Sequence, residues 1–363
     1  MAKLFVKNLR KVFGELEAVK GISFNVDEKE TLCLLGPSGC GKTTTLRCIA
    51  GLEIPTSGEI YINSTLINDL PPQKRGIGLV FQDYAVFPHM TVYDNLAFGL
   101  QVRKMEKSKI DSKVKEIARL LDLENVLQRY AKRLSLSEIQ RVAIGRAIAV
   151  DPEILLLDEP LSNLDARTRE KMRTELKEIQ MKVGITSVYV THDQLEAMTL
   201  ADRIAVMNNG LIEQIGKPSE IYDNPKTLFV ARFIGTPSMN FIDCSFIEKN
   251  GKAIIDASEF YLDVSDISSI IKEKSTTSEL ILGCRSEDII IETKKTSPDS
   301  IEVEVKFIEN LGAKSIYHLG IGEKRILVKT HIIPGIKIGS KVWILFNKNK
   351  IHLFDKKTNL AII

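Results

Sequence analysis

Apolar residues in the first two thirds of the chain form short continuous runs that alternate with longer stretches of helical periodicity. Short continuous runs are typical of buried parallel strands, because both faces of such strands are covered. These runs lie at residues 31–35, 77–81, 154–157, 186–190 and 204–207. Between the second and third runs, Ile110, Val114, Ile117 and Leu121 would share one face of a helix. Strands that alternate with helices predict an α/β domain with a mostly parallel sheet.

A different pattern begins after Pro237, where short strands are separated by turns. Residues 301–307 alternate apolar and charged side chains, which places one face against a core and the other in solvent. Short apolar runs at 325–329 and 342–346 continue the series, and together they predict a small β-barrel or sandwich. The expected domains are an α/β domain at 1–235 with a helical subdomain at about 88–152, and a β-rich domain at 236–363.

The length of 363 residues agrees with this division, since a single domain commonly has about 100–200 residues. The 50 Lys and Arg residues nearly balance the 47 Asp and Glu residues, so the net charge of +3 gives no electrostatic case for binding nucleic acid. No apolar run reaches the roughly 18–20 residues that span a bilayer. The five cysteines contain no Cys-x-x-Cys pair, which favours reduced, buried thiols in a cytosolic protein.

A phosphate-binding pattern follows the first apolar run. Gly36-Pro-Ser-Gly-Cys-Gly-Lys-Thr43 fits Gly-x4-Gly-Lys-Thr between a predicted strand and a predicted helix. Glycines let the backbone approach a polyphosphate, toward which backbone N–H groups and the positive end of the helix dipole point. Lys42 would reach the β- and γ-phosphates, and the Thr43 hydroxyl would ligate Mg²⁺. The residues assigned to the nucleotide are Gly36, Pro37, Ser38, Gly39, Cys40, Gly41, Lys42, Thr43 and Thr44.

Two acidic residues, Asp158 and Glu159, come at the end of the third apolar run. A carboxylate at a strand end suits a Mg²⁺ ligand, and Glu159 is placed to polarise an attacking water. His192 and Gln82 follow other predicted strands, at the carboxyl edge where ligands bind in open α/β sheets. His192 fits a γ-phosphate contact, and Gln82 fits a ligand of Mg²⁺ or of the water.

Taken together, these residues resemble the ATP-binding subunit of an ABC transporter. The motifs that occur in the order of that family are the phosphate loop, Gln82, Leu134-Ser135, Asp158-Glu159, Ser162-Asn-Leu-Asp165 and His192. The resemblance implies a P-loop NTPase fold with ATP and Mg²⁺ as cofactors, and the catalytic residues would be Lys42, Gln82, Glu159 and His192. Glu159 would be the general base, while His192 would hold both the γ-phosphate and the base.

The resemblance also implies a homodimer in which two subunits close head to tail around two ATP molecules. In that arrangement Ser135 meets the γ-phosphate bound by the partner subunit. Asp165 resembles the residue that links the two sites across the dimer. Phe13, just before Gly14, resembles the aromatic residue that stacks on adenine.

Further segments are similar to importers of the maltose and glycerol-3-phosphate type. They lie at residues 81–92, 223–235, 236–241, 283–289 and 309–312. This similarity implies an OB-like regulatory domain at the C-terminus and transmembrane permease subunits as partners. An extracytoplasmic solute-binding protein would take part indirectly, and the chain would lie at the cytoplasmic face of the cell membrane. Import of a polyamine or of iron stays open as an alternative to a sugar or glycerol 3-phosphate.

Two other classes of ABC protein are disfavoured. DNA-repair and chromosome-organising ATPases insert a long coiled coil between the phosphate loop and the acidic pair, whereas about 115 residues without sustained heptads lie between Thr43 and Asp158. ABC proteins that act on ribosomes usually carry two ATPase units, whereas one phosphate loop occurs in this chain. We therefore expect no nucleic-acid partner.

The predicted signature segment departs from the family pattern. Where the family has Leu-Ser-Gly-Gly-Gln, this chain has Leu134-Ser-Leu-Ser-Glu138. Both glycines, which let a backbone approach phosphate closely, are replaced, and Glu138 would bring a carboxylate near the phosphates. We expect a working ATPase with a weakened composite site, with an impaired or regulatory subunit as the alternative. Replacing Leu136 and Ser137 by glycine should then raise ATP turnover.

Overall fold

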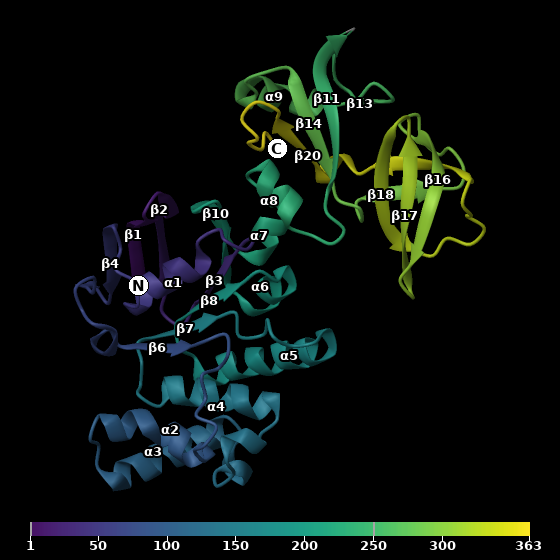
Figure 1. Ribbon diagram of the computed structural model, residues 1–363. Helices are drawn as coiled ribbons and strands as arrows, with labels where there is room; N and C mark the ends of the chain where they lie inside the picture. Colours follow the sequence, from purple (N-terminus) through teal and green to yellow (C-terminus); the bar gives the residue numbers. More distant parts are fainter. Residues whose placement is uncertain (1, 250) are drawn as a thin grey trace. The chain divides into compact units, whose positions relative to one another are not determined.

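The computed structural model describes residues 2–249 and 251–363 and divides into two compact units, Met1–Pro218 and Ser219–Ile363 (Figure 1). The division falls after the first residue of α7 (Pro218–Asp223) and before α8 (Leu228–Phe233), whereas the sequence pattern placed the boundary at residue 235. The cause is packing within the second unit, where Leu228 of α8 shares a hydrophobic cluster with Phe354.

The first unit is built around a six-stranded sheet in the order β10-β9-β3-β8-β7-β6, in which β9, β3, β8, β7 and β6 are parallel. Every residue of β3, β7 and β8 is buried, as the apolar runs predicted, and the α/β fold is confirmed. The strands of this sheet are β3 (Thr31–Leu35), β6 (Ile77–Val80), β7 (Ile154–Asp158), β8 (Ser187–Thr191), β9 (Arg203–Asn208) and β10 (Leu211–Gly216).

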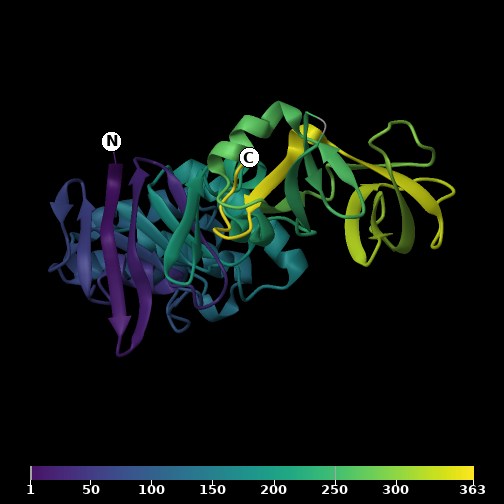
Figure 2. The ribbon, with the colours of Figure 1, turned by 90° about the horizontal axis from the view of Figure 1, so that it is seen from above.

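A second sheet of this unit is antiparallel, in the order β2-β1-β4-β5. Figure 2 shows its two long strands, β1 and β2, side by side in purple. The sheet consists of β1 (Ala2–Phe13), β2 (Leu16–Asp27), β4 (Ser57–Ile62) and β5 (Thr65–Leu66). Side chains from both sheets share one hydrophobic core, which includes Leu4, Ile60, Leu32 and Leu156.

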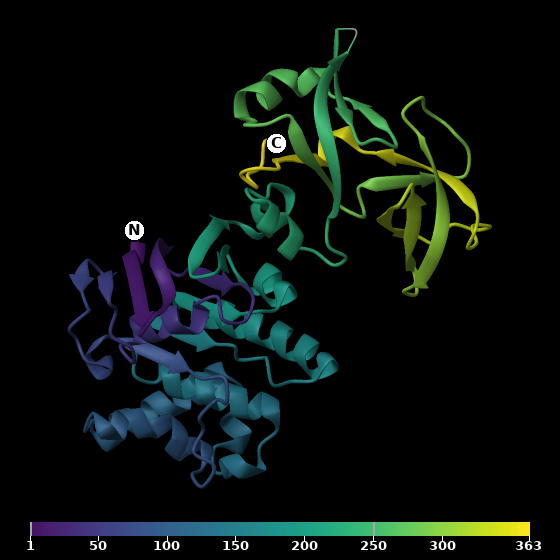
Figure 3. The same ribbon diagram turned by 45° about the horizontal axis from the view of Figure 1, so that its top comes forward.

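Three helices lie within residues 88–152, the range expected for a helical subdomain, and Figure 3 shows them grouped together. They are α2 (Val92–Val102), α3 (Lys107–Leu120) and α4 (Leu136–Ile148). A capping box of Thr91 and Asp94 starts α2. Helices α2 and α4 approach closely at Gly145, where a Cβ atom would lie 2.5 Å from Leu96. The remaining helices of the unit are α1 (Lys42–Ala50), α5 (Ala166–Val183) and α6 (Gln194–Leu200).

The second unit contains two five-stranded antiparallel sheets, in the orders β13-β12-β11-β14-β20 and β15-β19-β16-β17-β18. One core cluster draws on both, with Ile255 and Leu282 from the first and Val303 and Ile344 from the second. The elements are β11 (Asn240–Lys249), β12 (Lys252–Asp256), β13 (Tyr261–Asp263), α9 (Ser268–Lys274), β14 (Glu279–Cys284), β15 (Ile289–Glu292), β16 (Ile301–Asn310), β17 (Lys314–Ile321), β18 (Lys324–His331), β19 (Lys341–Phe346) and β20 (Ile351–Asp355). The predicted β-rich character is confirmed.

All five cysteines are free and buried, and burial raises the pKa of each thiol. They are distributed over both units, with Cys33, Cys40 and Cys48 in the first and Cys244 and Cys284 in the second. Among the described residues, no helix combines the length and apolar character needed to cross a bilayer.

Candidate functional site

The parallel strands bring the predicted site residues to one edge of the sheet. Strands β3, β8, β7 and β6 are neighbours and run in the same direction, so their carboxyl ends lie together. The phosphate loop leaves β3, Asp158 ends β7, and Thr191 ends β8. This is the edge where ligands bind in open α/β sheets.

The phosphate loop depends on glycine at two close approaches. A Cβ atom on Gly41 would lie 2.5 Å from the carbonyl oxygen of Ala18, and one on Gly36 would lie 2.3 Å from that of Met207. Gly41 also has a φ of 102°, which side chains disfavour. Helix α1 starts directly after it without a side-chain cap and without an acidic residue in its first turn. Its positive end therefore suits an anion.

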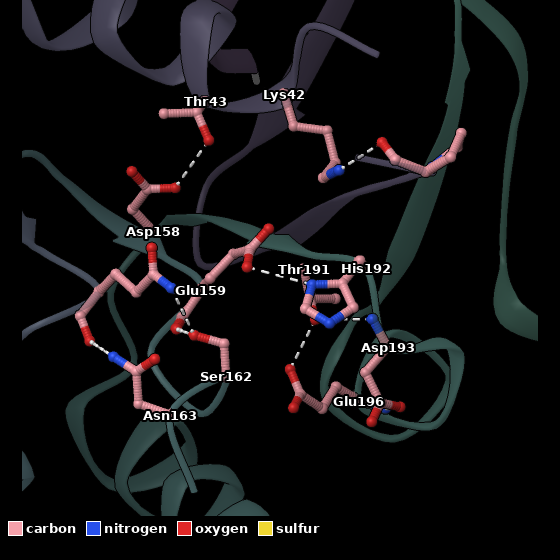
Figure 4. Close-up of polar contacts among 12 residues, drawn as sticks. Lys42, Thr43, Asp158, Glu159, Ser162, Asn163, Thr191, His192, Asp193 and Glu196 are labelled. Atoms are coloured by element: carbon pink, nitrogen blue, oxygen red, sulfur yellow. Dashed lines mark hydrogen bonds and ion pairs between the residues drawn. The ribbon is translucent and has the colours of Figure 1, made fainter. Parts of the chain in front are cut away.

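Lysine and threonine side chains of this loop point to different partners (Figure 4). Lys42 is buried, and its Nζ donates hydrogen bonds to the carbonyl oxygens of Gly36 at 2.8 Å and Pro37 at 2.9 Å. The Thr43 hydroxyl donates to Oδ1 of Asp158 at 3.2 Å. The neighbouring Cys40 is buried, with its Sγ 3.9 Å from Nζ of Lys42.

Asp158 has the environment of a cation ligand. Burial raises the pKa of its carboxyl, and the neighbouring charge of Glu159 adds to the rise, against the hydrogen bond from Thr43. A nearby cation would relieve this electrostatic cost. Carboxylate and hydroxyl oxygens are hard donors of the kind that Mg²⁺ prefers. Thr43 and Asp158 therefore fit a Mg²⁺ ion that also binds phosphate oxygens.

Glu159 and His192 form a pair at the ends of β7 and β8 (Figure 4). A hydrogen bond joins Oε2 of Glu159 and Nδ1 of His192 at 3.1 Å. Glu159 has a positive φ of 43°, and its backbone N–H donates to the carbonyl oxygen of Val190 at 3.0 Å. The carboxylate is one-fifth exposed, which leaves access for a water molecule. A carboxylate that is oriented by an imidazole can act as a general base.

Gln82 contacts the turn that follows Glu159. Its side-chain Nε2 donates to the hydroxyl of Ser162 at 3.0 Å, and its backbone carbonyl oxygen accepts from Nδ2 of Asn163 at 3.3 Å. Both hydrogen bonds lead to the segment 162–163, and the role of Gln82 toward Mg²⁺ or water stays a prediction.

Phe13, Ser135 and Asp165 lie outside this cluster, and the described residues show no hydrogen bond between any of them and the phosphate loop. Phe13 is 42% exposed, with Nζ of Lys11 4.6 Å from its ring centroid. Asp165 caps α5 by accepting from the N–H of Thr168 at 3.1 Å.

The signature segment forms a capping box at the start of α4. Oε2 of Glu138 accepts hydrogen bonds from the N–H of Ser135 at 2.7 Å and from its hydroxyl at 2.9 Å. Arg129 pairs with the other carboxylate oxygen at 3.3 Å. The sequence pattern suggested only a carboxylate near the phosphates, whereas in the structure this carboxylate binds Ser135 itself. Leu136 is half exposed, and the Ser137 hydroxyl donates to Glu175 of α5 at 2.6 Å.

Three residues near the cluster were missed by the sequence reasoning. Glu196 is 2% exposed and accepts from the hydroxyls of Tyr189 at 2.8 Å and Thr191 at 2.7 Å, and burial raises its pKa. Arg169 of α5 donates to the carbonyl oxygens of Ser162 at 3.3 Å and Leu164 at 2.8 Å. A lone acidic or basic residue on a predicted helix gives no sequence signal of such burial.

Tyr84 is the third residue that the sequence reasoning missed. It lines a cavity of about 240 Å³ between β6 and the helices α2 and α4. The cavity is also lined by Phe81, Phe98, Ala147 and Arg146. The guanidinium of Arg146 lies over the ring of Phe87, 4.2 Å from its centroid.

Comparisons with known proteins identify the family of the chain. A family model described as ABC transporter matches residues 19–162, and one described as MalK OB fold domain matches residues 235–289. A trehalose/maltose import ATP-binding protein, MalK of Thermococcus litoralis, is 46% identical over the full length of both chains. The sn-glycerol-3-phosphate import ATP-binding protein UgpC of Cupriavidus pinatubonensis and the oligosaccharides import ATP-binding protein MsmX of Bacillus subtilis are each 41% identical, again over both full lengths.

Among solved structures, cbiO1 from Clostridium perfringens, part of the ABC transporter complex cbiONQ, is similar with a TM-score of 0.56 and 30% identity. The similarity covers 61% of this chain and 90% of that one.

Proposed function

The chain belongs to the ATP-binding subunits of ABC transporters, and from this membership we propose that it powers the uptake of a sugar or of glycerol 3-phosphate through a separate permease. It is the ATP-hydrolysing subunit of an ABC importer. Relatives that share its full length are named for the import of trehalose or maltose, of glycerol-3-phosphate and of oligosaccharides. The match of the MalK OB fold domain supports the same class of solute.

The hydrogen-bonded pair of Glu159 and His192, beside the phosphate loop, is the observation that carries the proposed site. Lys42 and the N-terminus of α1 would bind the β- and γ-phosphates. Glu159 would take a proton from the attacking water, while His192 would orient Glu159 and contact the γ-phosphate. Mg²⁺, held by Thr43 and Asp158 and by Gln82 from the predicted set, would supply positive charge to the phosphate oxygens.

Two copies of the chain would complete the site. Ser135, at the start of α4, would face the nucleotide of the partner subunit, as the resemblance to the family implies. Asp165, at the start of α5, would link the two sites, and Phe13 would stack on adenine with the ring face that Lys11 leaves free. The dimer would lie at the cytoplasmic face of the membrane, joined to permease subunits, with a solute-binding protein acting from the other side.

ATP hydrolysis by the purified chain tests the site. We expect Glu159→Gln to lower turnover by at least about a hundredfold while ATP binding is retained, since positioned acid–base groups commonly contribute factors of 10²–10⁴. Glu116→Gln on α3 is the matched control, because Glu116 pairs with Lys113 and lies outside the site. Equal turnover of the parent chain and of Glu159→Gln would overturn the assignment of the base.

Affinity purification from detergent-solubilised membranes tests the importer and its solute. Permease subunits should co-purify with the chain, and cells that lack the chain should lose uptake of radiolabelled maltose or of glycerol 3-phosphate. Loss of polyamine or iron uptake, with both of these solutes still imported, would refute the proposed solute class. Recovery of ribosomes in place of membrane proteins would refute the importer.

A further inference from the structure

The hydroxyl of Tyr84 contacts the segment that holds Glu159. Tyr84 is 8% exposed, and its hydroxyl donates a buried hydrogen bond of 2.8 Å to the carbonyl oxygen of Pro160. Pro160 follows Glu159 directly in the chain, so the bond lies one peptide from the proposed base.

The backbone on both sides of this hydrogen bond is strained. Tyr84 and Ala85 are consecutive non-glycine residues with positive φ angles of 61° and 47°, and Glu159 has a φ of 43°. Such conformations cost free energy and persist only where the surrounding structure holds them. The Tyr84 hydroxyl therefore joins two segments whose geometry depends on outside contacts.

Further hydrogen bonds hold the backbone at Tyr84 and Ala85. Its N–H donates to the carbonyl oxygen of Phe81 at 2.9 Å, and the guanidinium of Arg146 donates to the carbonyl oxygen of Ala85. Arg146 belongs to α4 and is itself fixed over the ring of Phe87. The ring of Tyr84 thus has a fixed place in the wall of the cavity, from which its hydroxyl can support Pro160.

We infer that Tyr84 is a positioning residue for hydrolysis: its hydroxyl fixes the peptide after Glu159 and thereby the direction of the Glu159 carboxylate. The inference rests on the proposed function, since it assigns Tyr84 a role only through the base. It also gives the cavity a physical connection to the reaction, because the same side chain lines the cavity and supports the turn at Pro160.

Removal of the Tyr84 hydroxyl should lower the rate of ATP hydrolysis without weakening the binding of the nucleotide. Tyr84→Phe keeps the ring in the cavity wall and leaves the Pro160 carbonyl without this donor. Small misplacements of a catalytic group can cost up to about a hundredfold in rate. Among the described residues, the hydrogen bonds of Tyr84 lead to Phe81 and Pro160 and none leads to the phosphate loop. The KM for ATP should therefore change by less than about twofold while kcat falls about ten- to a hundredfold.

The decisive experiment is a double-mutant cycle on the full chain with Glu159→Gln. Because Tyr84 acts through Glu159, Tyr84→Phe should not lower further the residual ATP turnover of the Glu159→Gln variant. Tyr93→Phe is the matched control, since the Tyr93 hydroxyl binds Asp111 within the helical subdomain, and it should leave kcat unchanged. Thermal unfolding of each variant verifies that it is folded.

Three outcomes would overturn the inference: kcat of Tyr84→Phe equal to that of the parent, a loss confined to KM, or the same fold-loss in the presence and absence of Glu159. These outcomes all require a parent chain whose turnover depends on Glu159. A parent chain whose turnover is unaffected by Glu159→Gln instead overturns the proposed base, and with it the role of Tyr84. The two failures are therefore distinguishable in one set of measurements.

Discussion

Replacement of Glu138 by glutamine should strengthen the response of the dimer to ATP. In the proposed composite site, the γ-phosphate on the partner subunit must reach the Ser135 hydroxyl and the positive end of α4. The Glu138 carboxylate already accepts hydrogen bonds from these groups, at 2.7 Å from the N–H of Ser135 at the start of α4 and at 2.9 Å from the Ser135 hydroxyl. Helix α1, which would bind the phosphates within its own chain, has no such acidic residue in its first turn.

The magnitude follows from charge and distance. Two unit charges about 6 Å apart repel by roughly 3 kcal/mol at an effective dielectric constant of 20. Arg129, 3.3 Å from the carboxylate, offsets part of this repulsion, and the side chain can turn toward solvent. We therefore expect removal of the charge to be worth about 1–2 kcal/mol, or a five- to thirtyfold lower ATP concentration at half-maximal turnover.

Glutamine is the appropriate replacement because it also serves at the third position of a capping box. The fold of α4 should then be kept, and thermal unfolding should change by no more than a few degrees. The assay is ATP turnover as a function of ATP concentration, with ATP-dependent dimer formation measured by light scattering. Glu116→Gln provides the matched control at an ion pair on α3. An unchanged half-maximal concentration for Glu138→Gln would refute the competition between Glu138 and phosphate.

Four further outcomes are expected. Leu136→Gly should raise ATP turnover, because Leu136 is half exposed at the N-terminal end of α4, which would face phosphate in the proposed dimer. Ser137→Gly should lower the melting temperature, because it removes the hydroxyl that binds Glu175. Arg285→Met should destabilise the second unit in urea unfolding by about 1–3 kcal/mol for each acceptor left without a donor, because the buried guanidinium binds the carbonyl oxygens of Tyr222 and Ile234. Glu196→Gln should raise the melting temperature at neutral pH. Burial raises the pKa of Glu196 in the folded chain, so its contribution to stability is fully present below its pKa in the unfolded chain. That contribution is lost as the pH rises through the raised pKa of the folded chain. The melting temperature of Glu196→Gln should therefore fall less than that of the parent over this pH range.

The parallel sheet and the nucleotide site were the parts most accessible from sequence. Continuous apolar runs mark strands whose two faces are covered, and the phosphate loop has a fixed spacing because backbone N–H groups must surround phosphate. Pairing of Glu159 with His192 was implied by the family order and is present at 3.1 Å. These features depend on local sequence and on the direction of neighbouring strands.

Contacts between distant segments could not be predicted in the same way. The bond from Tyr84 to Pro160 joins residues 76 positions apart, and no periodicity or motif indicates it. The capping box of Ser135 and Glu138 was readable in principle, as Ser-x-x-Glu before a helix. The family pattern predicts glycines at this helix start, whereas the residues present form hydrogen bonds that the family pattern does not indicate.

The buried thiols make the chain suitable for site-directed labelling. Maleimide reagents attack exposed thiolates, and each native cysteine is shielded and has a raised pKa. A single cysteine introduced on the surface should therefore react alone, with all five native ones left in place. Spin labels at Asp165 or beside Phe13 could then report the distance between the two subunits of the proposed dimer during an ATP cycle. Cys40 of the phosphate loop would not have to be replaced for this measurement.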